Sequence, residues 1–190
     1  MRVAPIVLTA LALTSLAALG CGGPEANGPG AASPTSGGAG AAAGATATDF
    51  TARDYEGKTV RLADYLGKKA IVLNFWATWC EPCIAEFPHL RKMQEANKDK
   101  LQILGVSMDG PESVANVPAF AKRNQINFPV LLDEDSHVAA LYNPKKSAPL
   151  SVLIDKSGRI VNIREGYNPG DEEFLAKDVA KMLDGSAPSK

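Results

Sequence analysis

The chain has 190 residues, of which 45% are hydrophobic, and 20 Lys and Arg residues stand against 21 Asp and Glu residues. This length suits one globular domain with additional segments, and the balanced charge without a basic block argues against a nucleic-acid partner. Charge indicates no other class of partner.

The first 21 residues predict export from the cytoplasm. After Arg2, the sequence VAPIVLTALALTSLAALG carries no charge and is apolar or small throughout, as in a secretory signal or a membrane anchor. It ends in A-A-L-G-C, which resembles the lipobox of bacterial lipoproteins, although Ala18 stands where that motif prefers Leu. We expect residues 1–21 to be a signal peptide that ends at a lipid-modified Cys21. An uncleaved anchor and an ordinary signal remain as alternatives.

Residues 22–48 predict a flexible linker. They consist mainly of Gly, Ala, Ser, Thr and Pro with a single charge, so they cannot bury enough apolar surface to offset the entropy of ordering. Square-root scaling gives such a linker a reach of roughly 30 Å. We therefore expect residues 49–190 to form the folded domain, tethered to the lipid bilayer of a bacterial membrane and placed in the periplasm or cell envelope.

Strands and helices alternate from Asp49 onward. Segments 50–55 and 58–62 predict a hairpin around Glu56–Gly57, and the apolar runs 70–76 and 101–107 predict buried strands. Three further strands are expected in 128–133, 151–155 and 159–165, the last two joined by a Lys-Ser-Gly turn. This order predicts an α/β fold, and the closing hairpin makes the central sheet mixed.

Three helices are expected between these strands. The first spans about 80–97, with one side lined by Ile84, Phe87, Leu90 and Met93. The second starts at Asp109 with Pro111 in its first turn, although Pro118 must kink it or mark its true beginning. The third covers 171–183, and its acidic first turn suits the helix dipole.

Two cysteines, Cys80 and Cys83, lie where the 70–76 strand gives way to the first helix. A structural zinc ion needs four ligands, and His89, His137 and Cys21 do not supply a second pair with suitable spacing. Two inert buried cysteines are also disfavoured, because a strand-to-helix junction is usually a surface corner. We therefore expect no metal at this pair.

A redox couple explains the spacing of these cysteines. If the helix begins at Cys80, its sulfur faces unpaired backbone N–H groups and the positive end of the dipole, which stabilise a thiolate. Cys83 lies within one turn of this sulfur, and Pro82 fits the first turn without needing a donor. Assigning Cys21 to lipid resolves the odd cysteine count. The sequence predicts an exposed Cys80 sulfur and a redox-active Cys80–Cys83 disulfide with no other cofactor.

Residues 72–88, VLNFWATWCEPCIAEFP, resemble the thioredoxin superfamily. More narrowly, they resemble the membrane-tethered TlpA/ResA-like thiol–disulfide oxidoreductases of the bacterial envelope. The resemblance covers about residues 49–184. It implies a thioredoxin-like fold with a central mixed sheet flanked by helices, an N-terminal β-hairpin and a helix insertion near 111–124.

The resemblance also assigns roles to residues. Cys80 would attack a substrate disulfide, and Cys83 would then resolve the mixed disulfide. Pro149 matches the family's cis-proline, which faces the cysteine pair, and the backbone of Ala148 would dock substrate. The remaining substrate-binding positions would be those at the rim of the pair, namely Trp79, Glu81 and Pro82, whereas Trp76 would serve packing.

Two positions differ from ordinary cytoplasmic thioredoxin. Asn74 occupies the place of a buried aspartate, so that proton relay is absent. Glu86 lies one helical turn after Cys83, as in the TlpA/ResA group, and is expected to accept the proton of the resolving thiol. The alternative for Glu86 is a solvated helix carboxylate.

The expected activity is reduction of disulfides in exported proteins, with apocytochrome c suggested by the resemblance and a membrane electron donor as partner. Negative charge from Glu81 and Glu86 opposes the helix dipole, which disfavours thiolate and makes the couple reducing. Three alternatives remain open. A peroxiredoxin needs Thr where Ala77 stands, with Thr78 one place late; an SCO-type copper chaperone needs cysteines four apart; a non-enzymatic lipoprotein would use the fold only for binding.

Overall fold

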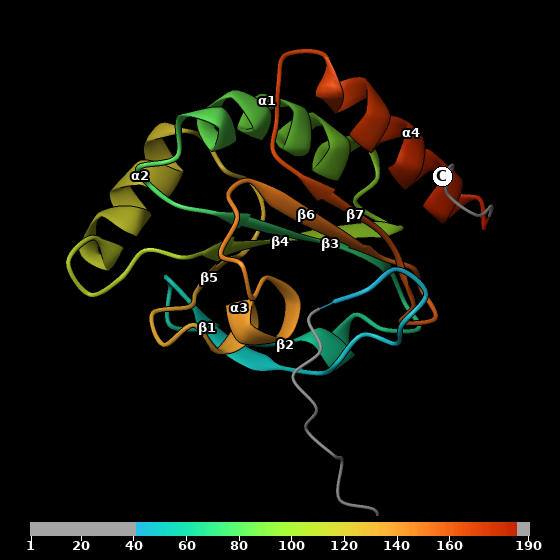
Figure 1. Cartoon of the computed structure of the whole chain (residues 1–190), viewed down its shortest axis with the longest axis horizontal. Coiled ribbons are helices and arrows are strands. Elements are labelled where there is room, and N and C mark those ends of the chain that lie inside the picture. Colours follow the sequence, from blue (N-terminus) through green and yellow to red (C-terminus); the bar gives the residue numbers. More distant parts are fainter. Residues whose placement is uncertain (1–40, 186–190) are drawn as a thin grey trace, which may run out of the picture. The chain divides into compact units, whose positions relative to one another are not determined.

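The computed structural model describes residues 41–185, in which a seven-stranded sheet carries helices on both faces (Figure 1). The strands are β1 (Thr51–Asp54), β2 (Thr59–Arg61), β3 (Ala70–Trp76), β4 (Leu101–Ser107), β5 (Val130–Leu132), β6 (Leu150–Ile154) and β7 (Ile160–Glu165). The helices are α1 (Glu81–Ala96), α2 (Val117–Arg123), α3 (His137–Tyr142) and α4 (Asp171–Leu183), with short 3₁₀ turns at Leu62–Asp64 and Val114–Asn116.

The strand order is β2-β1-β5-β4-β3-β6-β7. The β3–β4 and β4–β5 pairs are parallel. The β3–β6, β6–β7, β1–β5 and β1–β2 pairs are antiparallel. The sheet is therefore mixed, as the sequence predicts. Its centre is β3, which pairs with β4 on one side and β6 on the other.

Alternate residues of β3 enter two separate cores. Val72 and Trp76 belong to the core beneath α1, α2 and α4, whereas Leu73 and Phe75 belong to the core that includes α3 and Leu62 (Figure 1). All seven residues of β3 are buried. A strand covered on both faces explains why this segment reads as a continuous apolar run rather than an alternating one.

The first helix starts where expected, but its predicted buried side is partly wrong. Ile84 is 37% exposed, whereas Cys83, Phe87, Leu90 and Gln94 are buried. The predicted stripe used a spacing of three residues throughout, and this spacing drifts around a helix of 3.6 residues per turn. The real buried face passes through Cys83 and Glu86, so it includes the reactive side chains of this helix.

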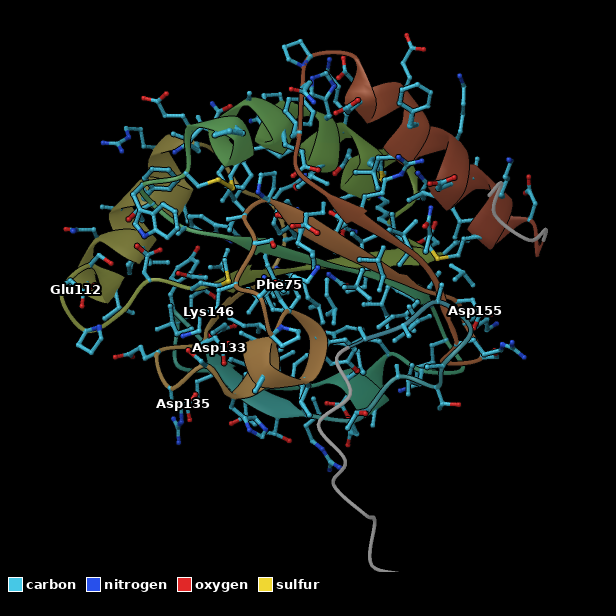
Figure 2. The ribbon with its side chains drawn as sticks, viewed as in Figure 1. Phe75, Glu112, Asp133, Asp135, Lys146 and Asp155 are labelled. Carbon is cyan, nitrogen blue, oxygen red and sulfur yellow. A yellow bond between two sulfur atoms is a disulfide. The ribbon has the colours of Figure 1, made fainter. Side chains whose placement is uncertain are left out.

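Two other helical expectations need correction. The second helix begins at Val117 rather than near Asp109, because Pro118 occupies its first turn and only a 3₁₀ turn precedes it. The short helix α3 was not predicted at all. It starts where the Asp133 carboxylate accepts hydrogen bonds from the backbone N–H groups of Val138 and Ala139, both at 2.8 Å (Figure 2).

The folded region starts earlier than the predicted linker boundary at residue 48. Gly44 N–H donates to the Ile160 carbonyl at 2.7 Å, and Ala47 N–H donates to the Gly158 carbonyl at 2.8 Å. Ala47 is also buried in the core near α3. Residues 44–48 therefore belong to the domain. The predicted signal peptide, Cys21 and the linker up to residue 40 lie outside the described residues.

Within residues 41–185, every helix is too short or too polar to cross a bilayer.

Gly105 on β4 leaves room for two aromatic side chains under α1. A Cβ atom at this position would lie 3.0 Å from Trp76 Nε1 and 3.1 Å from Phe128 Cε2. Both rings are buried in the same core, so they cannot move aside without disturbing their neighbours. We expect Gly105→Ala to lower the free energy of unfolding by about 1–3 kcal/mol, measured by urea denaturation.

Gly110→Ala provides the matched control for Gly105→Ala. A Cβ atom at Gly110 would meet only the carboxylate end of Glu112, 2.9 Å away, and this side chain is exposed and flexible (Figure 2). The control should therefore change stability by less than about 0.5 kcal/mol. Equal effects of the two substitutions would show that the packing of Trp76 does not require a glycine on β4.

Candidate active site

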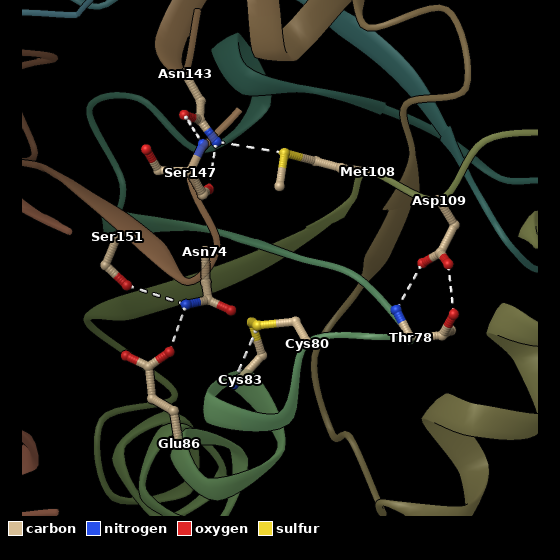
Figure 3. Close-up of a disulfide and its surroundings, with 10 residues drawn as sticks. All are labelled: Asn74, Thr78, Cys80, Cys83, Glu86, Met108, Asp109, Asn143, Ser147 and Ser151. Atoms are coloured by element: carbon tan, nitrogen blue, oxygen red, sulfur yellow. Dashed lines mark hydrogen bonds between the residues drawn. A yellow bond between two sulfur atoms is a disulfide. The ribbon is translucent and has the colours of Figure 1, made fainter. Parts of the chain in front are cut away.

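The two cysteines form a disulfide at the beginning of α1, with their Cα atoms 5.3 Å apart (Figure 3). Cys80 is the N-cap residue, and its sulfur accepts a hydrogen bond from the backbone N–H of Cys83 at 3.3 Å. Pro82 lies in the first turn, where a missing N–H costs nothing. The prediction that the helix begins at the first cysteine is therefore confirmed, and the disulfide agrees with a redox couple.

The expectation of an exposed Cys80 sulfur is wrong for this oxidised form. Cys80 is only 4% exposed and Cys83 is fully buried. Both side chains belong to the core under α1, and Ala148 packs against that core. The two residues nevertheless differ, because only Cys80 retains any accessible surface.

The loop between β3 and α1 is anchored by Asp109, which the sequence analysis missed. The buried Asp109 carboxylate accepts hydrogen bonds from the Thr78 backbone N–H at 3.0 Å and from the Ser107 hydroxyl at 2.8 Å. The Thr78 hydroxyl donates to its other oxygen (Figure 3). These bonds fix the path of the chain just before Cys80. The available signal was the pair of polar residues directly at the end of the buried 101–107 run.

The segment before β6 reaches the same corner of the fold. The Ala148–Pro149 peptide bond is cis, as expected from the resemblance. Because Leu150 pairs with Phe75 in antiparallel register, Pro149 precedes β6 at the edge where β3 ends and the cysteine loop begins. The approach to this point is held by Asn143, whose side chain accepts from the Ser147 N–H at 2.9 Å and donates to the Ser147 carbonyl at 2.8 Å.

The residues expected to form the rim of the site differ in their exposure. Trp79, directly before Cys80, is 66% exposed, and Glu81 and Pro82 in the first turn of α1 are also exposed. Ala148 is half-buried and Pro149 is buried. Trp76, in contrast, is fully buried and stacks on Phe120, which agrees with a packing role.

Glu86 is buried rather than solvated, with 5% of its surface exposed. The alternative of a solvated helix carboxylate is therefore wrong. Its Oε2 atom accepts a hydrogen bond from Asn74 Nδ2 at 3.0 Å, and the same amide group donates to the Ser151 hydroxyl at 3.1 Å (Figure 3). Burial raises the pKa of Glu86 to about 7, although the hydrogen bond from Asn74 opposes this rise.

A cavity of about 380 Å³ lies next to Glu86, and residues from β7, the following loop and α4 form its other walls. Its lining residues are Glu86, Asn162, Ile163, Arg164, Glu165, Gly166, Tyr167, Asp171 and Leu175. The Tyr167 hydroxyl donates to Glu172 at 2.9 Å, and burial together with this bond raises the pKa of Tyr167 to about 12. Tyr167 therefore remains a neutral phenol beside Glu86.

The profile of the AhpC/TSA family matches residues 43–163. The chain belongs to the AhpC/TSA family. A thiol-disulfide oxidoreductase ResA from Geobacillus thermodenitrificans is 39% identical over 134 residues, which are 70% of this chain and 71% of that protein. The present chain is a thioredoxin-like thiol–disulfide oxidoreductase related to ResA and DsbE, and Cys80 and Cys83 form its CxxC disulfide.

Solved structures support the same assignment of this AhpC/TSA-family oxidoreductase. A protein of Chlorobium tepidum described as a thiol:disulfide interchange protein DsbE has a TM-score of 0.69 at 31% identity, covering 75% of this chain and 98% of that one. An exposed lipoprotein thioredoxin of Streptococcus pneumoniae has a TM-score of 0.60 at 29% identity, covering 73% and 99%. The predicted thioredoxin-like fold is confirmed.

The site of this family member is not arranged as the sequence analysis required for a peroxiredoxin. Ala77 stands three residues before Cys80, and the hydroxyl of Thr78 is engaged by Asp109. Cys80 is instead joined to Cys83 within one turn of helix. The arrangement thus serves exchange between one disulfide and another.

The raised pKa of Glu86 makes the stability of the oxidised oxidoreductase depend on pH. Its pKa is about 7 in the fold against 4.5 ordinarily, so the folded chain binds more protons than the unfolded chain between these values. The contribution of Glu86 is complete below pH 4.5 and is lost as the pH rises through 7. We expect a loss of about 3 kcal/mol in the free energy of unfolding between pH 4.5 and 8.

Glu86→Gln should abolish this part of the pH dependence, because the amide does not titrate. Urea denaturation of both proteins at several pH values measures the difference. Glu81→Gln, an exposed change on the same helix, should retain the wild-type dependence. Parallel curves for wild type and Glu86→Gln would show that Glu86 does not take up a proton in the fold.

Proposed function

We propose that this oxidoreductase reduces disulfide bonds of exported proteins on the outer side of a bacterial membrane. The observation that carries the proposal is the pairing of a helix-capping CxxC disulfide with a buried carboxylate, Glu86, one turn further along the same helix. In this proposal the first group exchanges disulfides, and the second accepts a proton from the resolving thiol.

In the reducing direction, the Cys80 thiolate attacks one sulfur of a substrate disulfide. A bond forms between Cys80 and that sulfur, and the other substrate sulfur leaves as a thiolate. Cys83 then gives its proton to Glu86 and attacks the Cys80 sulfur, which forms the Cys80–Cys83 disulfide and releases the second substrate sulfur. The substrate gains two electrons and the CxxC pair loses two.

Substrate docking is proposed for the rim of the disulfide. The indole of Trp79 offers an exposed apolar surface next to Cys80, and Glu81 and Pro82 continue this surface into the first turn of α1. Ala148 and Pro149 complete the rim from the segment before β6, where the backbone of Ala148 can pair with an extended peptide.

The proposed direction of electron transfer depends on how strongly the site stabilises a thiolate. The N-terminus of α1 stabilises a thiolate, but Glu86 becomes negatively charged above about pH 7 and opposes it from within the core. Glu81 adds charge only at the exposed surface, where solvent screens it. A less stabilised reduced state gives a lower reduction potential, as in reductases.

The proposed location follows from the N-terminal sequence. Residues 1–21 resemble an export signal that ends in a lipobox cysteine, Cys21, and one similar structure is of an exposed lipoprotein. Lipid at Cys21 would hold the domain to a bilayer, where a membrane electron donor can reduce Cys80 and Cys83. Apocytochrome c, the substrate suggested by the TlpA/ResA resemblance, would present its own cysteine pair before haem attachment.

The direction is tested by the reduction potential of the full chain in glutathione buffers. We expect a potential below about −200 mV, in the range of reducing CxxC proteins. Glu86→Gln should raise the potential, because it removes the negative charge that disfavours thiolate. A wild-type potential near about −120 mV, typical of strong oxidants, would contradict the reductase assignment.

Trapping identifies the substrates. In a Cys83→Ser variant expressed in its native envelope, mixed disulfides at Cys80 cannot be resolved and should accumulate, including species that carry cytochrome c polypeptides. In the matched Cys80→Ser variant, only the fully buried Cys83 remains of the CxxC pair, so these species should be absent. Accumulation of the same species in both variants would show that Cys80 is not the attacking thiol.

A further inference from the structure

The side-chain carbonyl of Asn74 is a buried acceptor that lacks a partner among residues 41–185. Asn74 is fully buried on β3, and both of its hydrogen bonds, to Glu86 and Ser151, are made by the Nδ2 amino group. The Oδ1 atom makes none. Figure 3 shows this oxygen pointing toward the Cys80–Cys83 disulfide.

The orientation of the amide follows from the chemistry of its neighbours. An ionised Glu86 carboxylate can only accept hydrogen bonds, so Nδ2 faces it and Oδ1 must face the opposite way. A buried carbonyl without a donor is unfavourable, and a disulfide has no proton to offer. Reduction changes this situation, because the disulfide toward which Oδ1 points becomes two thiols, and the fully buried Cys83 gains an S–H donor.

We propose that Asn74 is a positioning residue that accepts a hydrogen bond from the Cys83 thiol in the reduced enzyme while it donates one to the Glu86 carboxylate. This inference rests on the proposed role of Glu86 as proton acceptor. Asn74 then stabilises one protonation state of Cys83 and Glu86, in which the proton is on the Cys83 sulfur and the negative charge is on Glu86. That is the state required before the resolving step.

The same amide also suits the state that follows proton transfer. Once the Cys83 proton is on Glu86, a rotation of the Asn74 amide by 180° presents Nδ2 to the thiolate and Oδ1 to the protonated carboxyl group. The Ser151 hydroxyl can accept in the first arrangement and donate in the second. An aspartate at residue 74 offers only acceptors when ionised and cannot match the thiolate.

The polar and charged groups around Glu86 and Asn74 come from strands β3, β6 and β7 and from helices α1 and α4. The neighbouring strands β3 and β6 contribute the neutral Asn74 and Ser151. From β7 and the start of α4, the cavity beside Glu86 is lined by the charged residues Arg164, Glu165 and Asp171, with Tyr167 bound to Glu172. His89 lies 3.9 Å from Glu172, and Glu81 lies at the exposed start of α1.

Two substitutions separate the donor and acceptor functions of Asn74. Asn74→Leu, which has a similar shape, removes both functions. Without the Nδ2 donor the pKa of Glu86 should rise further above 7. While Glu86 is ionised it holds Nδ2, so Oδ1 faces the thiol, and without this acceptor the pKa of the Cys83 thiol should fall, each change being about one unit. Asn74→Asp removes only the donor, so the apparent pKa of the carboxyl pair should rise while that of Cys83 does not fall.

These pKa values can be read residue by residue in the reduced full-length chain by ¹³C NMR of labelled Glu and Cys side chains. A role in packing alone predicts the opposite result for Glu86, because a loosened core admits water and lowers its pKa toward 4.5. A fall of the Glu86 pKa in Asn74→Leu, or a Cys83 pKa that does not fall, would overturn the inference.

A measurement on the native chain avoids dependence on any variant folding. The ¹³C chemical shift of the Asn74 side-chain carbonyl carbon should change on reduction of the wild-type chain, because a new hydrogen bond forms at Oδ1. In the matched Cys83→Ala variant it should not shift on adding reductant, and Asn143, bound to Ser147, serves as an internal reference. An unchanged Asn74 signal in the wild type would also overturn the inference.

Failure of the proposed proton acceptor gives a different result. Rapid mixing of the reduced chain with a model disulfide measures the rate of the resolving step against pH. Glu86→Gln should slow this step about 100-fold. An unchanged rate would reject Glu86 as acceptor, whereas the hydrogen bond of the Cys83 thiol to Asn74 is read in the resting reduced chain without any turnover.

Discussion

The buried hydrogen bond between Asn74 and Glu86 joins the central strand to the helix that carries the cysteines. A carboxylate in a core is tolerated only when it is hydrogen-bonded or protonated, and this one is bonded and has a pKa near neutrality. The polar contact lies between Val72 and Trp76 on an otherwise apolar face of β3. The proposed chemistry of the site therefore depends on a group whose protonation is set by the core itself.

The sequence predicted those parts of the fold that depend on local pattern. The buried strands β3 and β4 and the helix α4 follow directly from apolar runs and an acidic first turn, and the CxxC spacing located the start of α1. Tertiary contacts decided the rest. Helix α3 depends on capping by Asp133, five residues before Val138. Cys80 is buried in a cluster built from distant segments, with Ala148 packed against that cluster. No local pattern contains either contact.

The site shows the same division. Glu86 could be selected from its position one turn after Cys83, but its burial could not, because the predicted apolar side was the one lined by Ile84, Phe87, Leu90 and Met93. Asn74 was interpreted as the absence of an aspartate. Its two donors and free carbonyl become meaningful only when β6 brings Ser151 to one side and α1 brings Glu86 to the other.

The cavity beside Glu86 shares no lining residue with the rim formed by Trp79, Glu81, Pro82, Ala148 and Pro149. One oxygen of Glu86 is bound by Asn74, and the cavity gives the carboxyl group a second side. A protein docked over Cys80 would leave this second side open. In the proposed mechanism, water on this second side carries the proton away during the covalent complex, so the enzyme need not release its partner before it returns the proton to bulk solvent.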